Sequence, residues 1–128
     1  MIAAILLAAS APAGAVLTCE AAYDNGQARP FRISFARRGS SVRNLAFEGD
    51  APTVFGNWRG RFRDGRILFR NSKRGMSSGE MTMTPRSDGR FGLTWSSTYG
   101  GGCIWFVDEG TAICSLVSGN IEFEAQTA

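Results

Sequence analysis

The chain contains no histidine, and it has a single lysine among its 14 basic residues. Histidine is the commonest general base near neutral pH and the commonest metal ligand, so its absence argues against both kinds of site. The sequence also lacks a phosphate-binding loop, a dinucleotide fingerprint, a calcium loop and a nucleophile elbow. The carboxylate pairs Asp108/Glu109 and Glu122/Glu124 are typical of solvated surface. We therefore expect no catalysis, no metal and no cofactor.

The N-terminus has an apolar run over residues 2–9, followed by small, turn-prone residues. The run is far shorter than the roughly 20 apolar residues that a transmembrane helix needs. Ala13-Gly14-Ala15 fits the small-x-small cleavage pattern of a signal peptide, although no basic residue precedes the run. We expect residues 1–15 to be a signal peptide and residues 16–128 to form one β domain. The mature protein would then be periplasmic or secreted, in a bacterium.

Three cysteines in an exported protein predict one disulfide and one free thiol. Cys103 and Cys114 flank a predicted hairpin, but their side chains would lie diagonally across it. A bond from Cys19 to Cys114 would join an early strand to a late one and close a longer loop. Both pairings, and that of Cys19 with Cys103, stay open at this point. No C-x-x-C pair is present, so the cysteines do not predict a metal site.

Apolar residues alternate with polar ones in most of the chain, and no stretch keeps a sustained helical period. Early strands are predicted around Leu17, Cys19 and Ala21, then Phe31, Ile33 and Phe35, then Val42, Leu45 and Phe47. A later hairpin pairs residues 80–86 with 90–96 around the loop 87–89. Its glycine suits the left-handed position of a three-residue loop. In that register Met83 lies opposite Leu93, and Met81 lies opposite Trp95.

The last third of the chain predicts a loop over residues 96–102, which contains three consecutive glycines. A hairpin of residues 103–107 and 111–117 follows, with its turn at 108–110, and a final strand begins at Ile121. The fold class is all-β: an antiparallel meander of about 8–10 short strands, forming a small barrel or a two-layer sandwich. We expect a monomer.

Residues 59–70 carry the strongest functional signal in the chain. Asp64 and Gly65 predict a two-residue turn, because both tolerate the positive φ of a type I′ hairpin. Cross-strand partners share a face. The predicted pairs are Arg63 with Arg66, Phe62 with Ile67, Arg61 with Leu68 and Arg59 with Arg70. One face then carries Trp58, Phe62, Ile67 and Phe69, and the other carries the candidate anion-binding set Arg59, Arg61, Arg63, Arg66 and Arg70.

All 14 basic residues lie between Arg29 and Arg90, against five acidic residues in the same segment. Such asymmetry indicates one basic surface. Arginine favours bidentate binding of phosphate, sulfate and carboxylate groups. We expect a non-catalytic protein that binds an anionic lipid or glycan of the envelope. The patch extends, on this hypothesis, to Arg43, Lys73, Arg74, Arg86 and Arg90. Nucleic acid is disfavoured because the aromatic residues alternate onto the opposite face.

Three alternatives remain. The first is a solvated face whose arginines pair with Glu80, Glu122 or Glu124. The second is an apolar ligand held near Trp58, Trp95, Trp105, Phe62 and Phe91. The third is a protein-binding module: Thr18-Cys19-Glu20 followed by Asn25-Gly26 distantly resembles the start of the bacterial lysozyme inhibitors. The Ser-Gly-x-x-Tyr stretch of that family is absent, and Ser78-Gly79-Glu80-Met81 stands in its place. That resemblance implies a small exported barrel that binds a protein partner.

Overall fold

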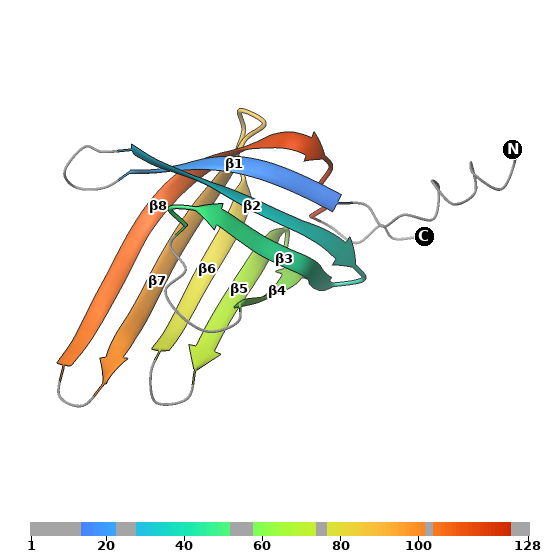
Figure 1. Ribbon diagram of the computed structural model, residues 1–128. Coiled ribbons are helices and arrows are strands. Elements are labelled where there is room, and N and C mark those ends of the chain that lie inside the picture. Colours follow the sequence, from blue (N-terminus) through green and yellow to red (C-terminus); the bar gives the residue numbers. More distant parts are fainter. Residues whose placement is uncertain (1–13, 23–27, 52–57, 74–76, 102–103, 124–128) are drawn as a thin grey trace, which may run out of the picture.

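The computed structural model describes residues 14–22, 28–51, 58–73, 77–101 and 104–123. These residues form a closed antiparallel barrel in which each strand pairs with the next and the last pairs with the first (Figure 1). The predicted all-β meander is confirmed, and closure decides for a barrel over a sandwich. The described part of the chain has no helix able to cross a membrane. The strands are β1 (Gly14–Ala22), β2 (Ala28–Arg38), β3 (Ser41–Gly49), β4 (Trp58–Arg63), β5 (Arg66–Lys73), β6 (Ser77–Pro85), β7 (Phe91–Gly101) and β8 (Ile104–Gly119).

One face of each strand supplies the core, as period-two alternation requires. The apolar residues predicted for the first two strands are all buried. The hairpin of β6 and β7 also has the predicted register, with Met83 opposite Leu93 and Met81 opposite Trp95. Its loop places Gly89 at φ 83°, in the left-handed region. Local sequence therefore determines both of these features.

Strand β8 corrects the prediction for the last third of the chain. The expected hairpin around 108–110 is absent, because β8 runs unbroken from Ile104 to Gly119. The expected loop over 96–102 is also wrong up to residue 101, since β7 continues through Gly101 and pairs there with Ile104. The physical reason lies at Gly110, which is opposite Trp95. A Cβ at Gly110 would lie 2.3 Å from Trp95 Cζ2, so this glycine makes room for an indole ring and does not form a turn.

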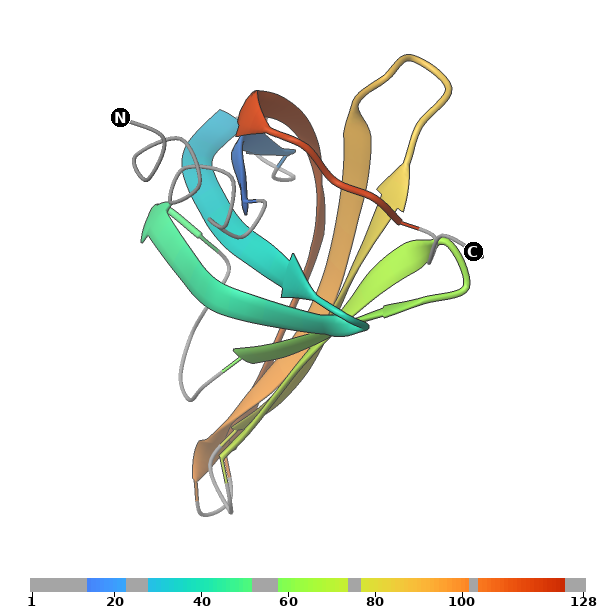
Figure 2. The ribbon, with the colours of Figure 1, turned by 90° about the vertical axis from the view of Figure 1, so that its right-hand side faces the viewer.

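The residues after β8 cross one end of the barrel, where the sequence predicted a further strand (Figure 2). Gly119, at φ 82°, changes the direction of the chain. Phe123 then stacks on Phe91 and packs edge-to-face with Phe62, at 5.5 and 6.2 Å between ring centroids respectively. Arg37 Nη1 donates a hydrogen bond to the carbonyl oxygen of Glu122. Residues 120–123 thus cover the core as a cap.

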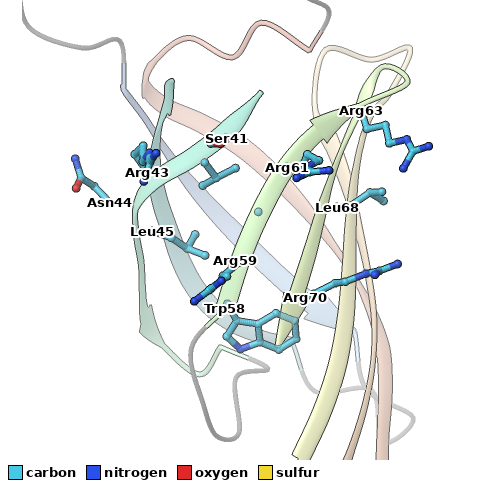
Figure 3. Close-up of a pocket in the computed structure, with 12 residues that line it drawn as sticks. Ser41, Arg43, Asn44, Leu45, Trp58, Arg59, Arg61, Arg63, Leu68 and Arg70 are labelled. Carbon is cyan, nitrogen blue, oxygen red and sulfur yellow. The ribbon is translucent and has the colours of Figure 1, made fainter. Parts of the chain in front are cut away.

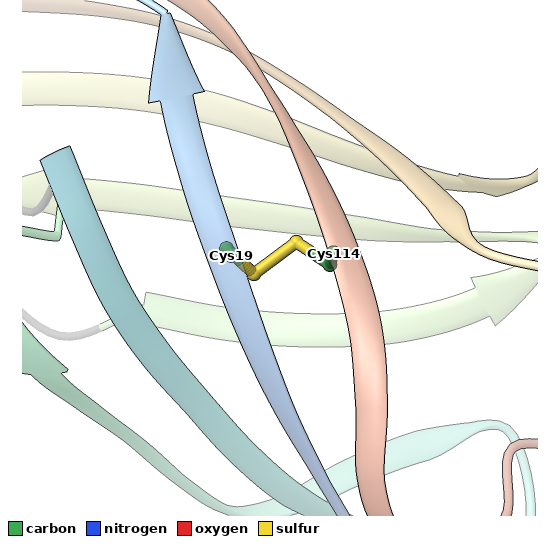
Figure 4. Close-up of a disulfide and its surroundings, with 2 residues drawn as sticks. All are labelled: Cys19 and Cys114. Carbon is green, nitrogen blue, oxygen red and sulfur yellow. A yellow bond between two sulfur atoms is a disulfide. The ribbon is translucent and has the colours of Figure 1, made fainter. Parts of the chain in front are cut away.

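The disulfide joins Cys19 on β1 to Cys114 on β8, which settles the pairing among the three alternatives (Figure 4). The two residues are direct partners in the β1–β8 register, and both are fully buried. The bond therefore closes the barrel covalently between its first and last strands. Cys103 lies outside the described residues.

The structure describes only the last two residues of the predicted signal peptide. Residues 1–13 of the expected signal peptide lie outside the described residues, as does the Asn25-Gly26 turn. Gly14 and Ala15 are the first residues of β1, and Ala15 is buried. The strand thus begins two residues before the expected cleavage point.

Reducing the disulfide should destabilise the barrel strongly. The cysteines are 95 residues apart, and a loop of that length corresponds to about 4.7 kcal/mol of lost unfolded-state entropy in the chain-entropy model. Urea unfolding with and without reductant measures the effect. Cys103→Ala is the matched control and should retain the full response to reductant. A Cys103→Ala protein that no longer responds would contradict the pairing.

Gly110→Ala should destabilise the protein by about 1–3 kcal/mol, because the added methyl group overlaps the Trp95 ring. Gly92→Ala on the neighbouring strand is the control, since its Cβ would meet no atom closer than 3.9 Å. Urea midpoints of the two variants provide the comparison. Equal midpoints would show that Gly110 does not pack against the indole.

Candidate functional site

The hairpin of β4 and β5 has the register that the sequence predicted. Arg63 pairs with Arg66, Phe62 with Ile67, Arg61 with Leu68 and Arg59 with Arg70. The turn residues Asp64 and Gly65 have φ values of 53° and 74°, as a type I′ turn requires. On the inward face Phe62, Ile67 and Phe69 are buried, and Trp58 is half-buried. On the outward face all five candidate arginines are exposed.

A cleft opens beside this hairpin, between β3 and β4. The two strands share a single residue pair, Ser41 with Arg61, and beyond it they diverge. The resulting cleft has a volume of about 1000 Å³ (Figure 3). Three strands line it, with the residues Ser41, Val42, Arg43, Asn44, Leu45, Trp58, Arg59, Gly60, Arg61, Arg63, Leu68 and Arg70.

A β-bulge in β3 lies where the strands separate. Ser34 pairs with Ala46 and Ala36 pairs with Arg43, so Asn44 and Leu45 together face one residue of β2. Asn44 adopts a left-handed φ of 54°. A bulge bends its strand and increases the local twist. Val42 and Leu45 are three positions apart, so in a regular strand they would point to opposite faces. The bulge explains why both pack against the core.

Four of the five predicted arginines line the cleft, namely Arg59, Arg61, Arg63 and Arg70. Arg66 is exposed on the same hairpin but is not part of the lining. Arg43, which the sequence-based hypothesis included in the extended patch, lines the cleft from β3. Local sequence had no means of bringing Arg43 and the hairpin together, because the contact depends on how β3 passes β4.

The cleft carries a concentration of positive charge with little compensation. No acidic residue is among its lining residues in the described part of the chain. Arg70 meets Glu80 and Arg63 meets Asp64, each at 3.7 Å between nitrogen and oxygen. Both ion pairs are largely exposed to solvent, and such pairs contribute about 0–1 kcal/mol. The ion pair between Arg70 and Glu80 is one of those that the solvated-face alternative predicted.

Arg86 and Arg90 show the opposite arrangement, and neither lines the cleft. Asp88 accepts from both guanidinium groups, with ion-pair distances of 3.1 Å to Arg86 and 2.9 Å to Arg90. The backbone N–H of Arg90 also donates a hydrogen bond to the Asp88 carboxylate at 2.9 Å. These two cations are therefore used within their own turn. The Lys73 side chain and Arg74 lie outside the described residues.

The aromatic residues considered for an apolar pocket separate into two groups. Phe62, Phe91 and Trp95 are buried in the core. Trp58 is half-buried and lines the lower end of the cleft, below Arg59 in Figure 3. The side chain of Trp105 lies outside the described residues.

Comparisons of the chain with protein-family models, with curated proteins and with solved structures give no significant match.

The turn at Asp88 should make stability depend on pH. The Arg90 backbone N–H, followed by the Arg90 and Arg86 side chains, lowers the pKa of Asp88 from 3.8 to about 2. A lowered folded-state pKa stabilises the protein above the unfolded pKa, and the contribution disappears as pH falls toward 2. Asp88→Asn should therefore lower the thermal midpoint at pH 6 and have a much smaller effect at pH 2. An equal loss at both pH values would contradict the ionised turn.

Proposed function

We propose that this protein is a non-catalytic binding protein of the bacterial envelope, and that it binds an anionic envelope component in the cleft between β3 and β4. The observation that carries the proposal is the convergence of five arginines from three strands on one cleft with no acidic lining residue among those described. Like charges at this spacing repel one another, and a bound anion removes that repulsion.

Arginine is suited to this role because its planar guanidinium group donates two parallel hydrogen bonds to a phosphate, sulfate or carboxylate. Within the described residues, Arg43, Arg59 and Arg61 form no ion pair. Their hydrogen-bond donors are available to a ligand without first breaking an internal salt bridge. Nucleic acid fits less well, because stacking of successive bases needs several exposed aromatic rings. The hairpin turns Phe62 and Phe69 inward, and only the half-buried Trp58 of its aromatic residues lines the cleft.

The test is binding to anionic lipid vesicles and to a sulfated glycan, at low and at physiological salt. Trp58 lines the cleft, so tryptophan emission reports occupancy. We expect binding that weakens steeply as salt rises. Arg59→Ser/Arg61→Ser should lower the affinity at least about tenfold, since hydrogen bonds to charged groups each contribute about 1.5–3 kcal/mol.

Arg32→Ser/Arg66→Ser is the matched control, because it removes two exposed arginines that do not line the cleft. It should change the affinity no more than about twofold. Equal losses in both double variants would assign binding to overall charge instead of the cleft. The absence of binding to either ligand would overturn the proposal and direct the search to a protein partner.

A further inference from the structure

Beneath its arginines the cleft has an apolar floor. Val42, Leu45 and Trp58 are half-buried and pack against the hydrophobic core from the β3–β4 seam. Figure 3 shows Leu45 extending from β3 toward β4, with Trp58 at the lower end of the cleft. Guanidinium groups and apolar side chains therefore line the same space.

Leu68 is the residue that a simple anion site does not explain. It lies on the outward face of β5, opposite Arg61 on one side and Thr82 on the other. Its neighbours on that face of the strand are Arg66 and Arg70, and Figure 3 places it between Arg63 and Arg70. The side chain is half-buried and lines the cleft. A leucine among arginines on an outer face offers an apolar contact where the neighbouring residues offer charge.

We infer that the ligand is an anionic amphiphile, a molecule with a phosphate, sulfate or carboxylate head and an alkyl portion; this inference rests on the proposed function. The arginines at the rim bind the head, and Val42, Leu45, Trp58 and Leu68 cover the first part of the alkyl chain. Small-molecule sites have volumes of about 300–1000 Å³. At about 1000 Å³ this cleft is large enough for such a ligand.

The alkyl chain does not pass Gly60 into the barrel, because the space over that residue is filled. A Cβ at Gly60 would lie 2.6 Å from Val42 Cγ2 and 2.9 Å from Phe69 Cδ1, so these two side chains already occupy the space over the glycine. Phe69 itself is fully buried. The apolar floor is therefore of limited extent. Affinity should rise with chain length only until the floor is covered.

Alkyl phosphates of increasing chain length test the inference, each used below its micelle concentration, with inorganic phosphate as the reference. Burial of one methylene group contributes about 0.8 kcal/mol, which corresponds to a gain in affinity of up to about fourfold per methylene. We expect a rise over the first several carbons and then a plateau, measured by calorimetry and by tryptophan emission.

Two variants separate the head from the chain. Leu45→Ser/Leu68→Ser should flatten the dependence on chain length and leave the binding of inorganic phosphate unchanged. Arg59→Ser/Arg61→Ser should weaken every ligand by a similar factor and keep the slope. Val107→Ser is the control, since Val107 is an apolar residue of β8 that is 63% exposed. It should behave as the parent protein does.

The possible failures are distinguishable. Arginine-dependent binding with no effect of chain length would overturn the amphiphile inference and leave the anion site in place. A dependence on chain length as steep in the leucine variant as in the parent would also overturn it, because Leu45 and Leu68 would then not contact the alkyl chain. If neither inorganic phosphate nor any alkyl phosphate binds, the anion site itself is wrong.

Discussion

Closure of the sheet between its first and last strands is the constraint on which the rest of this structure depends. Strand β1 pairs with β8 from Ala15 to Ala22, and the Cys19–Cys114 bond fixes that contact. An open meander would expose two strand edges and would leave its apolar face without an opposite layer. In the closed barrel, side chains from distant strands meet in the centre, as Phe35 does with Phe62 and Phe69 at 6.3 and 6.2 Å between ring centroids. Residues 120–123 then cover one end of that core.

The same closure accounts for the position of the cleft. Strands β7 and β8 pair continuously from Phe91–Cys114 to Gly101–Ile104, whereas β3 and β4 share one pair. In a closed barrel each strand pairs with both of its neighbours, although the number of paired residues differs from one contact to the next. Here the strands diverge between β3 and β4, which share the fewest pairs. The bulge at Asn44 lies at that seam and bends β3. The candidate site is therefore a consequence of strand geometry, and a sequence motif for it need not exist.

The features that could be predicted from the sequence are those that depend on residues close together in the chain. The 59–70 hairpin was predictable pair by pair, because Asp64 and Gly65 determine the turn and the turn determines the register. The course of β7 and β8 was not predictable in this way. In the sequence Gly110 resembles a turn residue, and its contact with Trp95 is evident only in the folded barrel. The cleft was predictable in part, because the outward position of its hairpin arginines follows from the alternation of side chains along a strand. Arg43 and Leu45 reach it only through a bulge and a seam that depend on the whole barrel.

Charge at the seam has a second physical explanation, because charged side chains beside an open strand edge oppose pairing with another chain. Arg43, Arg59 and Arg61 satisfy that requirement. Protection of an edge, however, is achieved by charge of either sign and requires no apolar floor beneath it. Elsewhere the chain neutralises clustered arginines, as Asp88 does for both guanidinium groups of its turn. At the seam no described acidic residue enters the lining, and Leu68 interrupts the arginines on their own face. Cations left available around an apolar surface fit a ligand that carries both a negative charge and an alkyl group, and edge protection alone accounts for only the first of these features.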